Sequence, residues 1–439
     1  KRISNLMEKY NEYKDSGVDW IGGIPREWSI KRVKEIFNIE RGKFTHRPRN
    51  DEKMYSNGVY PFIQTGDVAK SNKYVTTFKQ TLNENGIKVS RKFKKGTIVM
   101  TIAANIGDVA ILDFDSYFPD SLVAFKTKFC TNYFYYLLSA DKKALDNVKI
   151  TNTQDNLNLE RLNGLEKIFP PLKEQTQIAN YLDAKTTAID KKVNLLQQKI
   201  KHYKAYRKTL INKTVTKGLN KTVKLKDSGI NWIGEIPEHW EVKRLKDVSK
   251  IFTGNSISDK SMFEINKDAY NYIATKDINI HTKEVNYNNG VYIPKTDKSF
   301  KITKKNTSLI CLEGASAGKK LTFVDRQVAF VNKLCAIKSL DKNVFDKYIF
   351  YLLQTNLFNC QFFELLSGLI GGVSLGLLKY FNILVPALKE QQQIANYLDT
   401  KTTLIDKIVK NIETQITTLK ELRKTLINEV VTGKVKVSA

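Results

Sequence analysis

A segment that occurs twice constrains the fold of this chain more than any other feature of its sequence. The residues LKEQTQIANYLDAKTTAIDKK at 172–192 return as LKEQQQIANYLDTKTTLIDKI at 388–408. The similarity continues without a gap to the hexapeptide RKTLIN, which occurs at 207–212 and again at 423–428. Because such similar segments should adopt the same structure, the chain is predicted to contain two copies of one structural unit.

Both copies show the spacing of a long helix that packs against another helix. Apolar residues recur at every seventh position, and a second row three residues earlier is mostly small or β-branched, which is typical of a coiled coil. Prolines precede each copy, a glycine follows it and neither occurs inside, so a continuous helix of about 40 residues is predicted. The apolar row consists of Leu182, Ile189, Leu196, Tyr203 and Leu210 in the first helix and of Leu398, Ile405, Ile412, Leu419 and Leu426 in the second.

A second repeat precedes each of two diverged regions. The segment DSGVDWIGGIPREW at 15–28 returns as DSGINWIGEIPEHW at 227–240. A pair of tryptophans around an Ile-Pro turn predicts an apolar plug where a domain begins, with direct stacking on nucleic-acid bases as the alternative interpretation. These segments contain all four tryptophans of the chain, namely Trp20, Trp28, Trp232 and Trp240.

The two diverged regions keep a common order of elements. Runs of β-branched and aromatic residues, broken by Gly, Asn and Asp, predict short strands joined by turns, and an aromatic-rich helix follows in each half. The predicted fold class is therefore α+β, with two such domains and two long helices. The paired strand segments are 60–68 and 270–278, 94–112 and 304–323, and 121–126 and 333–338, and the paired helices are 132–139 and 347–354.

The repeats also predict where the domains begin and end. The unit is circular in order, because the N-terminal segment supplies what would follow the second helix, so the head and the tail of the chain are expected to meet. We expect an N-terminal segment at 1–15, a first variable domain at 16–169, a first helix with its linker at 170–226, a second variable domain at 227–385, and a second helix with its tail at 386–439.

The charge of the chain predicts an anionic partner. Lys and Arg number 72 against 45 Asp and Glu, which gives a formal net charge of +27. A nucleic acid is the expected polyanion; a membrane surface is the rival, but the longest apolar run, 365–378, is too short to cross a bilayer. The four cysteines form no CxxC pair and no signal-peptide pattern opens the sequence, so a cytoplasmic protein with reduced thiols is expected.

One basic loop is the main candidate for nucleic-acid contact. The sequence ERGKFTHRPRN at 40–50 combines arginine forks with amide and hydroxyl side chains, which suits contacts to phosphates and to base edges, although a solvated loop would look similar. Its equivalent in the second half, TGNSISDKS at 253–261, is polar and nearly neutral. With secondary candidates in four turns, the predicted DNA-binding residues are Arg41, Lys43, Thr45, Arg47, Arg49, Gln64, Thr65, Asn105, Thr253, Asn255, Thr275, Lys276, Ser316, Lys319 and Lys320.

Catalytic signatures are absent from the sequence. The segment GASAGKK at 314–320 has three residues between its glycines and Lys320 where a hydroxyl residue should hold magnesium, so we interpret it as a turn. The four histidines are scattered without metal-ligand spacing, and no nucleophile or paired-carboxylate pattern is found. The sequence therefore predicts a binding protein that is not an enzyme and holds no cofactor or metal.

The two helix starts PLKEQTQIANYLD and PALKEQQQIANYLD, the WIGxIPxxW segments and the diverged domains between them resemble the specificity (S) subunit of type I restriction-modification systems. The resemblance covers nearly the whole chain. The helix-start motif is specific because it occurs twice around variable domains. Its residues are Leu172, Glu174, Gln175, Ile178, Ala179 and Leu182 in the first copy and Leu388, Glu390, Gln391, Ile394, Ala395 and Leu398 in the second.

The resemblance implies a function in sequence-specific recognition of double-stranded DNA. In that family each variable domain is a target-recognition domain that reads one half of a split sequence, and the paired helices hold the halves at a fixed separation. The family's S subunit has no enzymatic activity of its own. It binds two modification subunits, which carry S-adenosylmethionine and methylate adenine, and two restriction subunits complete the complex. No family motif marks an individual DNA-contacting residue.

The helix spacing is physically consistent with that function. Two antiparallel helices with a shared seam would place the domains at opposite ends with pseudo-two-fold symmetry, near the separation of half-sites one turn of DNA apart, about 34 Å. Arg207 and Arg423 occupy seam positions, and each is expected either to meet Glu390 or Glu174 of the other helix or to extend its stem along the seam. The alternative functions are a coiled-coil scaffold that binds nucleic acid without sequence specificity, and a fused methyltransferase or nuclease.

Overall fold

The chain is divided into two compact units in the computed structural model. Unit 1 comprises residues 1–195 and 415–439, and unit 2 comprises residues 196–414, so each long helix contributes to both units. The structure describes residues 8–18, 21–103, 106–140, 159–230, 233–258, 263, 268–340, 342–366 and 371–437.

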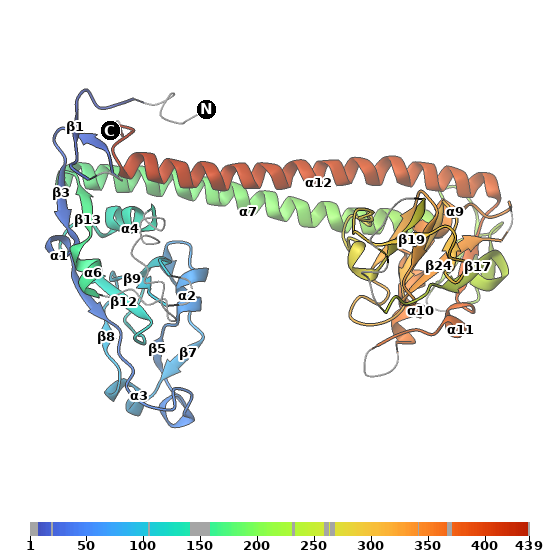
Figure 1. Ribbon diagram of the computed structural model, residues 1–439, viewed down its shortest axis with the longest axis horizontal. Helices are drawn as coiled ribbons and strands as arrows, with labels where there is room; N and C mark the ends of the chain where they lie inside the picture. Colours follow the sequence, from blue (N-terminus) through green and yellow to red (C-terminus); the bar gives the residue numbers. More distant parts are fainter. Residues whose placement is uncertain are drawn as a thin grey trace. The chain divides into compact units, whose positions relative to one another are not determined.

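The two predicted long helices are present as continuous elements. They are α7 (Leu172–Lys217) and α12 (Leu388–Val431) (Figure 1). From Val193 to Leu210 the half-buried residues of α7 are those of the two predicted rows, and every residue between them is exposed. Leu182 is fully buried, as are most of the corresponding row positions of α12, so the predicted seam is confirmed. None of the described helices combines the length and the apolar composition that crossing a membrane requires.

Ion pairs show that the two helices run in opposite directions in each unit. In unit 1, Arg423 near the end of α12 lies 3.1 Å from the carboxylate of Asp190 in the first half of α7. In unit 2 the roles are reversed, and Arg207 near the end of α7 lies 3.1 Å from the carboxylate of Asp406 in the first half of α12. The antiparallel arrangement predicted from the sequence is therefore confirmed.

The prediction that Arg207 and Arg423 meet Glu390 and Glu174 was wrong. Neither arginine pairs with Glu174 or Glu390. In unit 1, α12 ends at Val431, which packs in the same hydrophobic core as Leu182 of α7. Arg423 lies eight residues before this end, so it meets Asp190, well inside α7, and does not reach Glu174 in the first turn of α7.

Unit 1 carries two larger sheets of short strands, besides the two-stranded pairs β1 (Tyr13–Asp15) with β2 (Gly23–Pro25) and β3 (Ser29–Arg32) with β13 (Glu166–Phe169). The first is five-stranded, in the order β4 (Asn38–Arg41), β12 (Leu122–Lys126), β9 (Ile98–Thr101), β10 (Val109–Leu112) and β6 (Tyr74–Val75). The second is four-stranded, in the order β7 (Gln80–Leu82), β5 (Tyr60–Phe62), β11 (Ser116–Tyr117) and β8 (Lys92–Phe93). The other elements of unit 1 are α1 (Val33–Ile36), η2 (Glu52–Met54), α2 (Thr65–Lys70), α3 (Glu84–Lys88), α4 (Thr131–Ala140) and α6 (Leu159–Gly164).

Unit 2 repeats this strand order in its own two sheets. The first contains β17 (Ser249–Thr253), β24 (Leu334–Ser339), β21 (Thr307–Cys311) and β22 (Leu321–Val324). The second contains β19 (Tyr292–Pro294), β18 (Ala269–Ile273), β23 (Val328–Phe330) and β20 (Ile302–Thr303). Its other elements are β14 (Leu225–Asp227), β15 (Glu235–Pro237), β16 (Glu241–Arg244), α8 (Leu245–Val248), η4 (Thr275–Asp277), α9 (Asp346–Leu352), α10 (Asn356–Glu364), α11 (Leu375–Leu378) and β25 (Asn382–Val385).

The central strands are buried along their whole length and largely apolar because both of their faces are covered. In β9, Ile98 and Met100 pack in the core shared with α4 and the long helices, whereas Val99 packs in a second core shared with the other sheet. In unit 2, Ile310 and Leu309 of β21 divide between two cores in the same way. A strand buried on both sides needs a continuous apolar run, which explains why these segments were recognisable in the sequence. The predicted α+β class is confirmed.

A buried tryptophan joins each domain start to a long helix. In unit 1, Trp28 is fully buried, and its indole Nε1 donates to the Glu174 carboxylate at 3.0 Å. In unit 2, Trp240 is fully buried and donates to Glu390 at 3.1 Å. The predicted plug is confirmed for these two rings, whereas Trp20 and Trp232 lie outside the described residues. The glutamates of the helix-start motif therefore serve the domain junction.

The first residues of unit 1 lie against its last ones. The Tyr10 hydroxyl donates to Glu174 at 2.7 Å, next to the indole of Trp28. The Tyr13 hydroxyl donates to the Gly433 carbonyl at 3.0 Å, and the Lys436 amide donates to the Glu8 carbonyl at 2.9 Å. Burial and the neighbouring Glu174 raise the pKa of Tyr10, so this hydroxyl keeps its proton and remains a donor.

Lys283 of unit 2 is a half-buried lysine that faces another cation. Its ammonium donates to the Lys319 carbonyl at 2.8 Å, and the Arg207 guanidinium lies nearby. Desolvation, and secondarily the charge of Arg207, lower the pKa of Lys283 to about 8. The charged form of this side chain therefore opposes folding at neutral pH.

We predict that Glu174→Ala destabilises unit 1 more than Glu174→Gln does. The alanine variant leaves the indole N–H of Trp28 buried without its acceptor, which costs about 1–3 kcal/mol, whereas glutamine retains a carbonyl oxygen at that place. Denaturant unfolding of the full chain, followed by tryptophan fluorescence, measures the difference. Equal losses for the two variants would show that the hydrogen bond to Trp28 contributes nothing.

We predict that Lys283→Met stabilises unit 2 at pH 7 and removes a pH dependence. Because the folded-state pKa lies below the ordinary value of about 10.4, the unfolded chain binds more protons between those pH values, and stability rises with pH there. Methionine should increase the free energy of unfolding at pH 7 by about 1–2 kcal/mol. This is less than the full pKa shift of Lys283 corresponds to, because the side chain is partly exposed. Thermal unfolding of both proteins from pH 7 to pH 10 checks this; parallel curves would contradict it.

Candidate nucleic-acid interface

The predicted basic loop of unit 1 begins where the chain leaves the first sheet and crosses to the second. A Cβ atom built on Gly42 would lie 2.1 Å from the Pro119 carbonyl oxygen, so only glycine fits this position. The next amide, that of Lys43, donates to the Phe118 carbonyl at 3.0 Å. The loop is therefore anchored at its start on the segment between β11 and β12.

Unit 2 anchors its equivalent loop in the same way. A Cβ atom on Gly254 would lie 1.8 Å from the Phe330 carbonyl oxygen, and the Asn255 amide donates to that oxygen at 2.9 Å. The structure thus gives the candidates Thr253 and Asn255 the positions that Arg41 and Lys43 hold in unit 1. One backbone arrangement presents a basic loop in one unit and a neutral loop in the other.

The arginines of loop 40–50 are partly used to order the loop itself. Arg41 donates through Nε to the Asp120 carbonyl at 2.8 Å, and Arg49 lies 2.8 Å from the Asp120 carboxylate. Arg47 donates to the Phe44 carbonyl at 2.9 Å. Arg41 and Arg49 are exposed and keep further N–H groups, so they can contact phosphate while Asp120 fixes their place.

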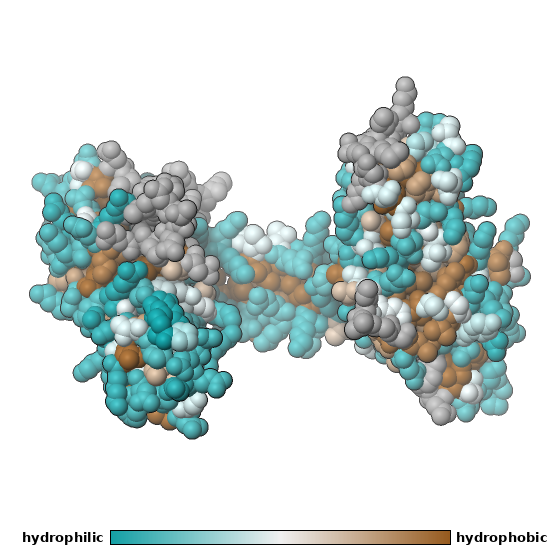
Figure 2. Space-filling model, turned by 60° about the horizontal axis from the view of Figure 1, so that its bottom comes forward, coloured by the Kyte–Doolittle hydropathy of each residue, from teal (hydrophilic) through white to brown (hydrophobic). Residues whose placement is uncertain are grey.

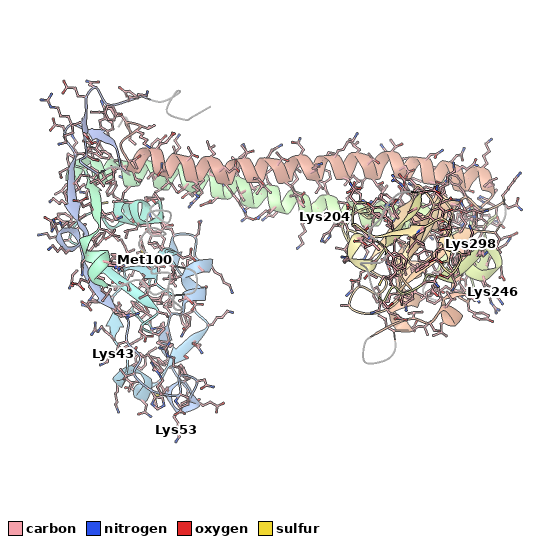
Figure 3. All side chains as sticks on the ribbon, viewed as in Figure 1. Lys43, Lys53, Met100, Lys204, Lys246 and Lys298 are labelled. Carbon is pink, nitrogen blue, oxygen red and sulfur yellow. The ribbon has the colours of Figure 1, made fainter. Side chains whose placement is uncertain are left out.

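Lys43 and Thr45 complete the loop. Both are exposed, and no hydrogen bond from the Lys43 ammonium to any described residue is present. Figure 3 shows Lys43 and Lys53 pointing outward from the part of unit 1 that lies away from the long helices. The Thr45 hydroxyl approaches the Val89 carbonyl at 3.4 Å. Among the predicted cations of loop 40–50, Lys43 is the one whose charged group makes no hydrogen bond to the described residues.

The candidate turn of unit 1 after β5 is the start of helix α2. The carboxylate of Asp67, which is nearly buried, accepts from the Gln64 amide at 2.9 Å and caps this first turn. The Gln64 side chain donates to Gln80 at 3.0 Å, and Thr65 is half-buried. The cap fixes the backbone, so the side chains at positions 64–66 can differ without loss of the turn.

The equivalent turn of unit 2 is capped identically. Asp277 accepts from the Ala274 amide at 2.9 Å, and Lys276 is exposed beside the half-buried Thr275. The Lys320 ammonium donates to the Thr275 carbonyl at 2.6 Å, so two of the predicted turns lie together. The structure therefore brings Thr275 and Lys320 into one cluster.

The remaining candidates are less closely associated. Ser316 and Lys319 belong to the turn that precedes β22, in which the Lys319 amide donates to the Ser316 carbonyl at 3.0 Å. Asn105 lies outside the described residues. Within the parts of unit 1 that the structure describes, no hydrogen bond joins loop 40–50 to the turn at Gln64 and Thr65. They form two separate candidate contact regions.

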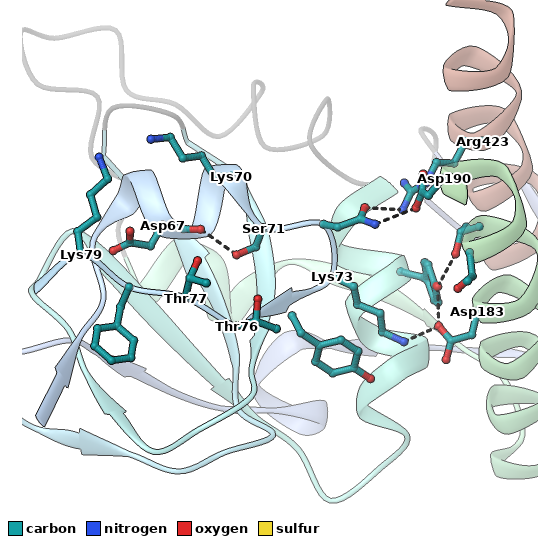
Figure 4. Close-up of a pocket in the computed structure, with 16 residues that line it drawn as sticks. Asp67, Lys70, Ser71, Lys73, Thr76, Thr77, Lys79, Asp183, Asp190 and Arg423 are labelled. Atoms are coloured by element: carbon teal, nitrogen blue, oxygen red, sulfur yellow. Dashed lines mark hydrogen bonds and ion pairs between the residues drawn. The ribbon is translucent and has the colours of Figure 1, made fainter. Parts of the chain in front are cut away.

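A polar cavity of about 800 Å³ in unit 1 was not predicted from the sequence. It lies between α2, the segment that follows it, α7 and α12 (Figure 4). Lys70 and Lys79 extend from its outer wall, whereas Lys73 and Arg423 reach carboxylates of α7. The sequence feature from which this cavity could have been predicted is the pair of lysines, Lys70 and Lys73, directly after the candidate turn.

The exposed side chains of these regions are chemically suited to binding a polyanion. Among the described residues, no group of three or more His, Cys, Asp or Glu side chains could hold a metal ion. In Figure 2 the lower, nearer part of unit 1 is largely hydrophilic. Exposed guanidinium, ammonium, hydroxyl and amide groups on anchored loops can contact phosphates and read base edges.

Two solved structures share the fold of this chain. A chain from a study of complex assembly and conformational transition of the type I R-M system matches with a TM-score of 0.72 and 16% sequence identity, over 93% of this chain and 98% of that one. The crystal structure of the HsdS subunit from Thermoanaerobacter tengcongensis matches with a TM-score of 0.53 and 16% identity, over 94% of this chain and 98% of that one.

Sequence comparison leads to the same group of proteins. The type I restriction enzyme MjaIX specificity subunit of Methanocaldococcus jannaschii is 26% identical in an alignment 446 positions long, which covers 97% of this chain and 97% of that one. The family model of the type I restriction modification DNA specificity domain matches twice, at residues 25–202 and 237–418, so that each match contains one variable domain and most of the following long helix. With both copies matched across most of its length, this chain belongs to the type I restriction-modification DNA specificity family.

Proposed function

We propose that the variable domain of each unit reads one half of a bipartite, asymmetric DNA target, and that α7 and α12 set the spacing between the halves. The observation that carries this proposal is that the same backbone arrangement presents different side chains in the two units. Arg41 and Lys43 of unit 1 stand where unit 2 has Thr253 and Asn255. Since base preference follows from side-chain chemistry, two unlike surfaces favour two unlike half-sites.

The turns after β5 and β18 support the same proposal. The buried aspartate cap is retained in both units, while Gln64 and Gly66 of unit 1 are replaced by Ala274 and Lys276 in unit 2. A capped turn that tolerates any outward side chain is suited to a surface that changes its target. Loop 40–50 and this turn are therefore the proposed DNA contacts of unit 1, with the corresponding loop, the turn at Thr275 and the lysines of 319–320 in unit 2.

The chain is proposed to act as a non-catalytic subunit of a larger complex. By analogy with the family, its partners would be two modification subunits, with two restriction subunits in the complete assembly. The outward faces of α7 and α12, which are exposed along their length, would be available to such partners. The cytoplasm, where the chromosome lies, is the expected site of action.

Exchange of the first variable domain tests the modular assignment. Residues 29–168 are replaced by the corresponding domain of another family member that has a different target, with α7 and α12 unchanged. We expect one half-site to change and the other half-site and the gap to stay the same, because unit 2 keeps its own loops. Methylome sequencing of cells that carry the complete system reads the result. A change in both halves, or in neither, would refute the assignment.

Lengthening the helices tests the spacing function. Insertion of one heptad into each helix, after Leu196 and at the facing position of α12, keeps the seam in register and extends each helix by about 10.5 Å. We expect the unread gap to grow by about 3 base pairs, at about 3.4 Å per step. Binding to a duplex series with graded gaps measures it. As a control, the insertion in α7 alone disrupts the register and should abolish binding, whereas an unchanged gap in the double insertion would exclude the spacing function.

A further inference from the structure

One asparagine of unit 1 joins a candidate reading turn to both long helices. Asn72 lies in the loop between α2 and β6, and its side-chain amide donates to Asp190 of α7 at 2.9 Å. Its side-chain oxygen lies 3.4 Å from the Arg423 guanidinium of α12. Its backbone carbonyl accepts from the hydroxyl of Tyr135 in α4 at 2.7 Å. Asn72 therefore contacts α4, α7 and α12 at once.

The next residue adds a second attachment. The ammonium of Lys73 pairs with Asp183 of α7, which also accepts from the Tyr136 hydroxyl at 2.6 Å. Figure 4 shows Lys73 reaching Asp183 and Arg423 lying beside Asp190. The loop after α2 is therefore held at two points along α7.

Helix α2 connects Asn72 to the candidate DNA-contact turn at Gln64 and Thr65. The candidate turn is the first turn of α2, and Asn72 follows the C-cap residue of α2, Ser71. The Asp67 cap closes one end, and the Ser71 hydroxyl donates to the Asp67 carbonyl at 2.8 Å at the other. Six helical residues span only about 9 Å, so the turn has little freedom to move relative to Asn72.

The inner wall of the cavity beside these residues is formed by the groups that attach the domain to the helices. Its two inner cations, Lys73 and Arg423, are each paired with a carboxylate of α7, whereas Lys70 and Lys79 extend from the outer wall. The groups of the inner wall satisfy each other across the domain and the helices.

Unit 2 lacks this attachment at the equivalent position. Thr282 replaces Asn72, and its hydroxyl accepts only from the Glu284 amide at 3.4 Å. Lys283 replaces Lys73 and donates to the Lys319 carbonyl within the domain. In the described part of unit 2, the domain reaches Arg207 and Asp399 of the long helices through Gln354 and Lys347 of the α9 region instead. The direct link from reading turn to helix pair belongs to unit 1.

We propose that Asn72 is a positioning residue that fixes the first reading turn relative to the helix pair and so narrows the range of gap lengths that the chain accepts. This inference rests on the proposed function and adds a specificity determinant that touches no base. Loss of Asn72 should leave base preference within each half-site unchanged, because the side chains that face DNA are untouched. It should weaken discrimination against a gap that is one base pair too long or too short.

The test compares gap selectivity in the full-length chain with its modification subunits. Competition binding uses duplexes that carry the natural half-sites with the natural gap, or with one base pair added or removed. For Asn72→Ala we expect the penalty for the altered gap to fall about five-fold, the effect of losing one hydrogen bond to a charged partner of about 1 kcal/mol. Asn72→Asp, which places a carboxylate against Asp190, should give at least the same loss.

Two controls separate positioning from damage to the fold. Thr282→Ala, at the equivalent position of unit 2, should leave the gap penalty unchanged, and melting temperatures verify that every variant folds. An unchanged penalty in both Asn72 variants, or an altered base preference within the first half-site, would overturn the inference. If the wild-type complex itself accepts all gaps equally, the proposed spacing function fails along with it.

Discussion

The seam between α7 and α12 is the interaction on which the rest of the structure depends, and hydrophobic burial alone does not specify it. Along the middle of α7 the row residues remain half-buried, although most row residues of α12 are buried. A seven-residue repeat offers the same apolar match at every heptad shift. Two ion pairs specify the register and the direction of the helices, because each pair can form in only one alignment. They join Arg423 to Asp190 and Arg207 to Asp406.

Duplication explains how one chain carries two surfaces of different chemistry. Three internal contacts are retained between the units: the glycine at the strand crossing, the buried aspartate that caps the turn after β5 or β18, and the tryptophan that donates to the helix-start glutamate. Each of these contacts is made by backbone or by an inward side chain. Outward side chains on the same loops take no part in these contacts, so they can change without altering the fold.

The sequence predicted the parts of the structure that depend on local pattern. The heptad rows, the apolar strand runs and the tryptophan plug follow from spacing and burial, and the structure confirms them at Leu182, Trp28 and their counterparts. The partners of the seam arginines were predicted wrongly, because they depend on where α12 ends and not on the heptads. Asn72 carried no signal at all, since an exposed asparagine in a loop is ordinary until three helices converge on it. The assignment of individual DNA contacts stays a prediction, because reading surfaces have no pattern of their own.

Two equivalent lysines, Lys73 and Lys283, lie in unlike environments, and one difference between the two aromatic helices contributes to this. In α9 of unit 2, Lys347 takes the place of Asn132 in α4 and lies 3.3 Å from Asp399. The equivalent carboxylate in unit 1, Asp183, receives Lys73. Because Asp399 already has its cation, Lys283 turns to a backbone carbonyl beside Arg207, and its pKa falls. In both units the aromatic helix thus contacts a carboxylate of the long helix, and in unit 1 the loop after α2 contacts α7 as well.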